Sequence, residues 1–136
     1  MFNLKFDNMI EREHAIEFKG VKIIVKFPNV GQLIDIEAAK QALTNNKYGS
    51  MASSGVKSMI YALDIVDAIV FVQIMCPQIK ALMNTTEYTS MSPEDTEELV
   101  MVYKTQIMPW YQKVLDQLYS SSNGKAKGTE PDNSVA

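Results

Sequence analysis

The amino-acid sequence predicts an α+β fold, mainly a helical bundle with a small antiparallel sheet or hairpin at its amino terminus. Up to Pro28, apolar and polar residues alternate as they do in strands. From Val30 to Tyr119, apolar residues recur at intervals of three and four, which is typical of amphipathic helices. Residues 120–136 contain one branched apolar residue and no aromatic residue, so we expect a disordered carboxyl-terminal tail.

The composition limits the organisation and the partners of the chain. Its 136 residues are near the commonest domain size, and we expect one domain over residues 1–119, β-rich over 1–28 and helical over 30–119. The formal charge of -3 provides no field that attracts nucleic acid or an anionic membrane. One cysteine cannot form an internal disulfide, and the amino terminus lacks the features of a signal peptide, so we expect a cytoplasmic protein.

The strands are predicted from alternation on both sides of a charged loop. Lys19-Gly20 separates two strand-like runs, and glycine tolerates the positive φ that a tight hairpin turn requires. Pro28 ends the last strand. The alternating apolar residues are Phe2, Leu4, Phe6, Ile16, Phe18, Val21, Ile23, Val25 and Phe27.

The first helix is predicted from Val30 to about Asn46. The segment GQLIDIEAAKQALTNN is rich in helix formers and ends in two asparagines. The small residues of KYGSMASSGVKS then predict a flexible connector, in which Ser53 or Ser54 is expected to cap the next helix.

The second helix is predicted from about Val56 to Met75 and is almost continuously apolar. Its length would suit a bilayer, but Asp64 and Asp67 near its middle would each cost roughly 2.5 to 3.5 kcal/mol there. A helix that is apolar nearly all round is instead typical of the centre of a bundle or of a surface covered by partner subunits, and we expect the bundle core. Pro77 should terminate or kink the helix.

The third helix has the clearest start signal in the chain. Ser92 can accept a hydrogen bond from an unpaired amide, Pro93 suits the first helical position, and the two acidic residues that follow oppose the positive end of the helix dipole. The apolar stripe continues through Pro109, so we expect a kinked helix or two collinear helices. This stripe consists of Val100, Tyr103, Ile107, Trp110, Val114 and Leu118.

Asp64 and Asp67 are the best candidate chemical pair, because a spacing of three places both carboxylates on one helical face. Such a pair could share a proton or position a metal. The preferred interpretation is structural, with hydrogen bonds to a tyrosine, a lysine or a loop amide, or exposure to water. No histidine or cysteine nearby completes a usual metal site, and we expect neither a metal nor a cofactor.

Three other features are expected to be structural, so we expect no enzyme. The segment from Gly49 to Ser58 superficially resembles a phosphate-binding loop, but five residues separate its glycines and it follows a helix. His14, the only histidine, is expected in an exposed loop without an orienting partner. Cys76 is expected to be a small buried apolar residue, because nothing basic adjoins it.

Tyr103, Ile107, Trp110 and Val114 are the residues that we expect to bind a partner. They share one helical stripe, and desolvated tryptophan and tyrosine side chains can contribute a large share of interface energy. The alternative is that the same aromatic residues fill the core. Nine methionines offer adaptable apolar surface, although core filling is again the preferred interpretation.

From Phe2 to Tyr119, the order of these features resembles the tail assembly chaperones of long-tailed bacteriophages. The matching features are the segments FDNMIEREHAIEFKGVKIIVKFPNVGQLIDIE and LDIVDAIV, and a capped acidic helix that ends in Pro109-Trp110-Tyr111. The family carries no catalytic residues, so the resemblance implies none here.

The resemblance implies a protein in the cytoplasm of the infected host cell that coats the helical, aggregation-prone tape-measure protein and recruits the tail-tube protein. Such a protein could also form homo-oligomers through its apolar surface. The alternative is a structural subunit of the phage tail, as a tube, neck or baseplate component. An enzyme that uses Asp64 and Asp67 is a distant third.

Overall fold

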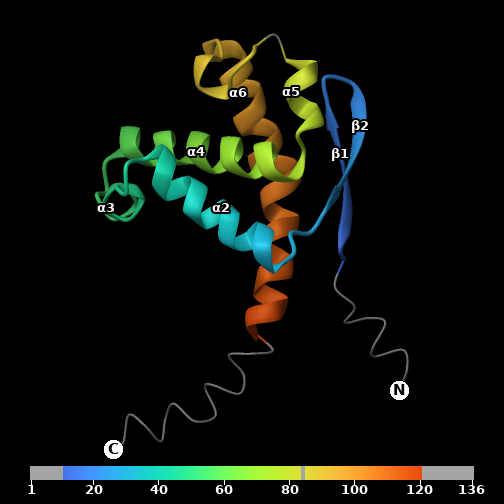
Figure 1. The fold of residues 1–136 in the computed structure, drawn as a ribbon, viewed down its shortest axis with the longest axis horizontal. Coiled ribbons are helices and arrows are strands. Elements are labelled where there is room, and N and C mark those ends of the chain that lie inside the picture. The colour runs from blue at the N-terminus through green and yellow to red at the C-terminus, as the bar shows by residue number, and fades with distance from the viewer. Residues whose placement is uncertain (1–10, 84, 121–136) are drawn as a thin grey trace, which may run out of the picture.

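The computed structural model describes residues 11–83 and 85–120 and has the predicted α+β fold, a hairpin followed by helices (Figure 1). The alternating residues Phe2, Leu4 and Phe6 and the tail from residue 121 lie outside the described residues. The elements are β1 (Glu13–Phe18), β2 (Val21–Lys26), α2 (Val30–Leu43), α3 (Tyr48–Ala52), α4 (Lys57–Met75), α5 (Gln78–Leu82), the 3-10 turn η1 (Tyr88–Ser90), α6 (Pro93–Val102) and the π-helical turn η2 (Tyr103–Ile107), after which an α-helix covers residues 108–120.

The hairpin forms where the alternation predicts it. Its two-residue turn places Lys19 at φ 50° and Gly20 at φ 79°, the left-handed conformation that glycine adopts without strain. Phe18 is paired with Val21 across this turn. One face of the sheet is buried against the helices, and its side chains are Ile16, Phe18, Ile23 and Val25.

Helix α2 begins at a capping box and ends close to the predicted position. The side-chain oxygen of Asn29 accepts a hydrogen bond from the Gln32 N–H at 2.8 Å, and the Gln32 side chain accepts one from the Asn29 N–H at 3.0 Å. The helix ends at Leu43, and Asn45 and Asn46 follow with positive φ. Asparagine tolerates this conformation, which suits the end of a helix.

The segment predicted to be a flexible connector contains the short helix α3, which packs on α4. The expectation that Ser53 or Ser54 caps α4 was wrong. The residue at the N-cap position is Val56, and the Ser54 hydroxyl accepts a hydrogen bond from the Val56 N–H at 3.1 Å. Gly55 turns the chain at φ 76° between the serines and the helix, so their oxygens lie too early to cap it.

Helix α4 lies at the centre of the helical part, as predicted. Helix α2 lies along one side of it. The long helix formed by α6, η2 and residues 108–120 crosses it (Figure 1). The helix ends at Met75, two residues before Pro77. Within the described residues it is the one helix long and apolar enough to cross a membrane, a property that core helices of soluble proteins share. Its buried residues are Leu63, Val66, Ala68, Ile69, Val70, Phe71 and Val72.

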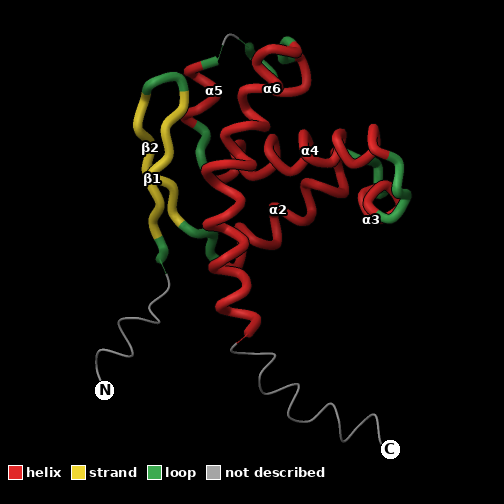
Figure 2. Tube along the Cα trace, turned by 180° about the vertical axis from the view of Figure 1, so that it is seen from behind, coloured by secondary structure: helices red, strands yellow, loops and turns green. Residues whose placement is uncertain are grey.

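Helix α6 starts as predicted, and the chain stays helical through Pro109. The Ser92 hydroxyl accepts a hydrogen bond from the Asp95 N–H at 3.1 Å. Where a kinked helix or two collinear helices were expected, η2 joins α6 to the helix over residues 108–120 by a π-helical turn, in which the Met108 N–H bonds to the Tyr103 carbonyl. The wider turn relieves the clash that a proline ring makes with a carbonyl four residues earlier. Figure 2 shows the resulting long helix beside the hairpin.

Candidate functional site

The four residues expected to bind a partner lie in the core of the chain. Tyr103, Ile107, Trp110 and Val114 are each at most 6% exposed. The Tyr103 ring lies 5.8 Å from the Phe71 ring of α4 between centroids. Because α4 covers the stripe on one side and the hairpin covers it on another, these side chains are not at the surface to anchor a partner. The structure therefore favours the alternative, in which they fill the core.

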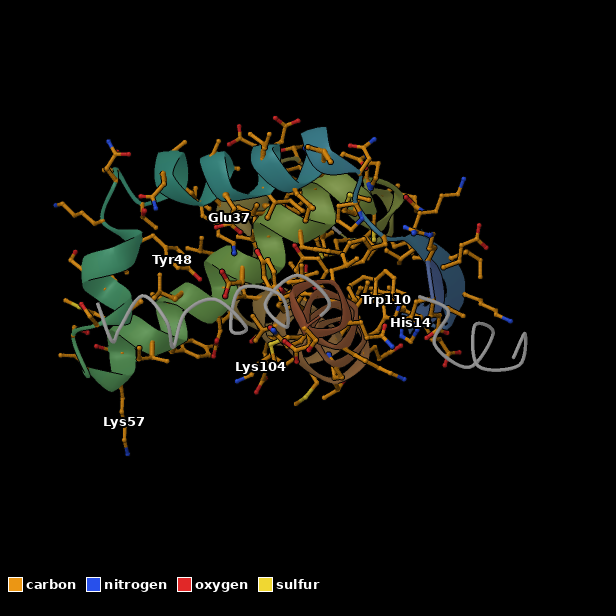
Figure 3. All side chains as sticks on the ribbon, turned by 90° about the horizontal axis from the view of Figure 1, so that it is seen from below. His14, Glu37, Tyr48, Lys57, Lys104 and Trp110 are labelled. Carbon is orange, nitrogen blue, oxygen red and sulfur yellow. The ribbon has the colours of Figure 1, made fainter. Side chains whose placement is uncertain are left out.

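Trp110 fixes the hairpin to the long helix. Its ring is stacked on the His14 ring, with centroids 5.0 Å apart and planes 8° apart. Figure 3 labels the two side chains next to each other. Its indole N–H donates to the Glu11 carbonyl at 2.8 Å, and the His14 Nε2 donates to the Gln106 carbonyl at 2.7 Å. The expectation that His14 is an exposed loop residue was wrong, because the residue belongs to β1 and lies against Trp110.

Among the described residues, a surface of α4 and the long helix is left uncovered, and we call it the α4–α6 face. Its four large apolar side chains are between 38% and 57% exposed. An ion pair lies among them, with the Lys104 ammonium 3.1 Å from the Asp64 carboxylate. The four apolar residues of this face are Ile60, Tyr61, Met101 and Met108.

Helical geometry places these residues around the ion pair. Ile60 and Tyr61 precede Asp64 by four and three positions, so all three lie on one side of α4. Met101 and Met108 lie three positions before and four after Lys104, so they flank it on the long helix. The α4–α6 face is therefore a band of adaptable apolar side chains with a charged centre.

The face exists because the amino-terminal half of α4 is incompletely covered. All seven buried residues of α4 lie from Leu63 onward, and Met59, Ile60 and Tyr61 before it are at least 40% exposed. Helix α2 and α3 cover one side of this half, whereas the long helix crosses α4 further along (Figure 1). Lys104 and Glu37 of α2 lie on opposite sides of α4 in Figure 3, so the α4–α6 face is directed away from α2.

Asp64 and Asp67 have different partners, Lys104 for Asp64 and two residues on the other side of α4 for Asp67. The Tyr48 hydroxyl donates to the Asp67 carboxylate at 2.7 Å, and the Lys40 ammonium lies 3.8 Å from it. Burial raises the pKa of Asp67, and the Tyr48 hydrogen bond and Lys40 oppose that shift. Burial also raises the pKa of Tyr48, so its hydroxyl remains a donor. The geometry agrees with the structural interpretation of the two aspartates.

Within 11–83 and 85–120, no group of three or more histidine, cysteine, aspartate or glutamate residues is placed to hold a metal ion. Cys76 is fully buried, and burial raises the pKa of its thiol to about 12, so it is a weak nucleophile. The segment from Gly49 to Ser58 that superficially resembles a phosphate-binding loop begins inside α3 and ends in the first residues of α4.

Comparison of the chain with protein family models, with curated proteins and with solved structures finds no match. The candidate site therefore rests on the geometry of the α4–α6 face. Sequence reasoning did not identify Ile60, Tyr61 or Met101 as members of a docking surface. One available signal was Asp64, because a carboxylate in an apolar helix marks the side that is not fully buried.

Proposed function

We propose that this protein is a tail assembly chaperone of a long-tailed bacteriophage, which binds the helical tape-measure protein and recruits the tail-tube protein in the cytoplasm of the infected host cell. The observation that carries the proposal is the α4–α6 face, where large apolar side chains are exposed around one ion pair. The resemblance of the sequence to this family supports the choice of the client.

The α4–α6 face has the chemistry that suits an amphipathic client helix. Such a helix presents apolar side chains along one stripe and is recognised by an apolar groove or face. Met101 and Met108 have flexible thioether side chains that can adapt to an irregular stripe, and Tyr61 offers an aromatic anchor. A client whose stripe is covered in this way is protected from aggregation.

The ion pair contributes orientation more than affinity. Lys104 and Asp64 are both partly exposed, and exposed pairs contribute about 1 kcal/mol or less. Charged groups at an interface mainly select the partner and its direction. A client with a carboxylate and a basic residue one helical turn apart would meet this pair with complementary charges.

A second apolar pair is available for another partner while the client is bound. Val30 and Ile34 lie one helical turn apart on α2 and are both strongly exposed. Helix α2 lies on the other side of α4 from Lys104 (Figure 3). This separation suits a protein that holds a client and recruits the tail-tube protein at the same time.

Mass spectrometry of infected cells and of purified virions tests the proposal. A chaperone is expected to co-purify with the tape-measure protein from infected cells and to be absent from finished virions. The presence of this chain at a fixed copy number in intact virions would contradict the proposal and favour a structural subunit of the tail.

A further inference from the structure

The backbone groups along one edge of β2 are directed away from the hairpin. In an antiparallel pair, these groups point alternately towards and away from the partner strand. The Glu17 N–H and carbonyl both bond to the side chain of Gln106, at 2.7 and 3.0 Å, so they point away from β2. Because Glu17 is paired with Lys22, the backbone groups of Lys22, Ile24 and Lys26 point away from β1.

None of the described segments bonds to this edge of β2. Within 11–83 and 85–120 the sheet has two strands, and the three residues make no further backbone hydrogen bond. The described helices all lie on the same side of the hairpin in Figures 1 and 2. A row of unpaired amides and carbonyls at a sheet edge is a template for an added strand.

The outer face of the hairpin carries two rows of opposite charge. The row on β2 is exposed and consists of Lys22, Ile24 and Lys26. The row on β1, in paired order, consists of Glu17, Ala15 and Glu13. Neither lysine of β2 forms an ion pair with a described residue. Both ammonium groups are therefore available to carboxylates on the open side of β2.

We propose that the open edge of β2 binds an extended acidic segment of a partner protein, which joins the hairpin as a third, antiparallel strand. Residues two apart in a strand lie on the same face. The recognised pattern is therefore acid-x-apolar-x-acid, with the apolar residue beside Ile24 and the acids beside Lys22 and Lys26. Opposite charges and apolar pairs on neighbouring strands stabilise the pairing. The β1 row has the same pattern on the other side of β2.

The charges disfavour a second copy of the chain at this edge. Two β2 strands paired about a two-fold axis would place Lys22 of each strand close to Lys26 of the other, and like charges directly opposite each other are destabilising. The β1 strand of a second copy is also unsuitable, because its Glu17 backbone groups are already bonded to Gln106. A partner with carboxylates in an extended segment has neither disadvantage.

A groove beside the end of β2 leaves room for side chains of the added strand. It has a volume of about 420 Å³ and is lined by Ile24 and Lys26 of the outer face, with Met75 of α4 among its other walls. An acidic side chain beside Lys26 would be partly enclosed there, which strengthens its attraction to the lysine. The inference does not depend on the proposed function.

NMR titration of the full chain with two capped peptides tests the charge pattern. The glutamate peptide reads Thr-Glu-Thr-Val-Thr-Glu-Thr, and the lysine peptide has lysine in place of both glutamates. The glutamate peptide should shift the amide signals of Lys22, Ile24 and Lys26 more than those of Ile23 and Val25, which face β1. At low salt it should bind about tenfold more tightly than the lysine peptide. No shift of the three edge amides, or equal affinities, would overturn the proposal.

Methylation of single peptide nitrogens tests the strand pairing. In the proposed arrangement the valine N–H of the glutamate peptide faces Ile24, whereas the N–H of the next threonine points away from β2. Methylation of the valine nitrogen should weaken binding about tenfold, because it removes a donor and blocks the approach of the strands. Methylation of the threonine nitrogen is the matched control and should change the affinity little. Equal effects of the two methyl groups would contradict the added strand.

Neutralisation of the lysine row locates the site on the protein. Lys22→Gln combined with Lys26→Gln should remove the preference for the glutamate peptide. The matched control, Lys47→Gln combined with Lys57→Gln, makes the same charge change at exposed positions outside the sheet and should keep the preference. An unchanged preference in the first variant would overturn the proposal. Concentration-dependent shifts of the edge amides in the protein alone would assign the edge to a second copy and would also contradict it.

Discussion

Lys104 of η2 and Asp64 of α4 form an ion pair at 3.1 Å that joins two helices in the middle of the α4–α6 face. Lys104 lies within the π-helical turn, and the extra residue of such a turn shifts the side chains that follow it around the helix. Met101 precedes the π-helical turn and Met108 follows it, and both are exposed. The local irregularity around Pro109 therefore contributes to the shape of the candidate docking surface.

Replacement of Trp110 should lower stability. Trp110→Ala removes a buried indole that packs on His14 and bonds to the Glu11 carbonyl, and we expect a loss of about 3 to 5 kcal/mol in the free energy of unfolding. Denaturant unfolding measures this loss. Tyr119→Ala is the matched control, because this aromatic residue is largely exposed and should change the free energy by less than about 0.5 kcal/mol. Equal effects of the two substitutions would contradict the packing of the hairpin on the long helix.

Gln106 should also contribute to stability, because its side chain makes two hydrogen bonds to the backbone of β1. Gln106→Ala removes both hydrogen bonds to the Glu17 backbone, and we expect a loss of about 1 to 2 kcal/mol in the free energy of unfolding. Gln112→Ala removes only an exposed contact with Asp116 and should cost less than about 0.5 kcal/mol. Thermal or denaturant unfolding measures the loss in the free energy of unfolding for each variant. Similar losses for the two variants would contradict a stabilising role of the Gln106 hydrogen bonds.

Asp67 should give the stability of the protein a measurable pH dependence. Burial raises the pKa of this carboxyl in the folded chain above its ordinary value of 3.8. At pH values between 3.8 and the folded pKa, the folded state binds the proton more tightly than the unfolded state does. The contribution of Asp67 to stability therefore increases as the pH falls through this window, and it is lost as the pH rises through the folded pKa.

The Asp67→Asn variant isolates this contribution. Asparagine keeps an acceptor for the Tyr48 hydroxyl but cannot titrate. We expect the melting temperature of the wild type, relative to that of the variant, to rise as the pH is lowered from about 7 to about 4. Scanning fluorimetry over this range measures the difference, and a constant difference would show that burial does not raise the pKa of Asp67.

Local signals in the sequence predicted much of the fold. The alternation around Lys19-Gly20 and the Ser92 start signal depend on residues close together in the chain, and the structure confirms both. The π-helical turn was not predicted, because Pro109 indicates a missing amide without deciding whether the helix kinks, breaks or widens.

The candidate site was harder to predict, because coverage depends on contacts between distant residues. The hairpin covers one side of the stripe that contains Trp110. Contacts such as that between Gln106 and Glu17 hold the hairpin against the long helix. Helix α4 is apolar nearly all round, so its sequence does not distinguish Ile60 and Tyr61 from the residues beneath the long helix. Only the crossing of the helices shows which part of α4 remains exposed.

Co-expression with the tape-measure protein tests the central claim most directly. The measurement is the fraction of the tape-measure protein that stays soluble with the wild type, with Tyr61→Asp on the α4–α6 face and with Ile34→Asp on α2 as the matched control. Both substitutions place a carboxylate at an exposed apolar position, so each should leave folding nearly unchanged, as thermal unfolding can verify. We predict that the wild type and Ile34→Asp keep the client soluble, whereas Tyr61→Asp does not. Equal solubility with all three proteins, or an insoluble client with the wild type, would contradict the account.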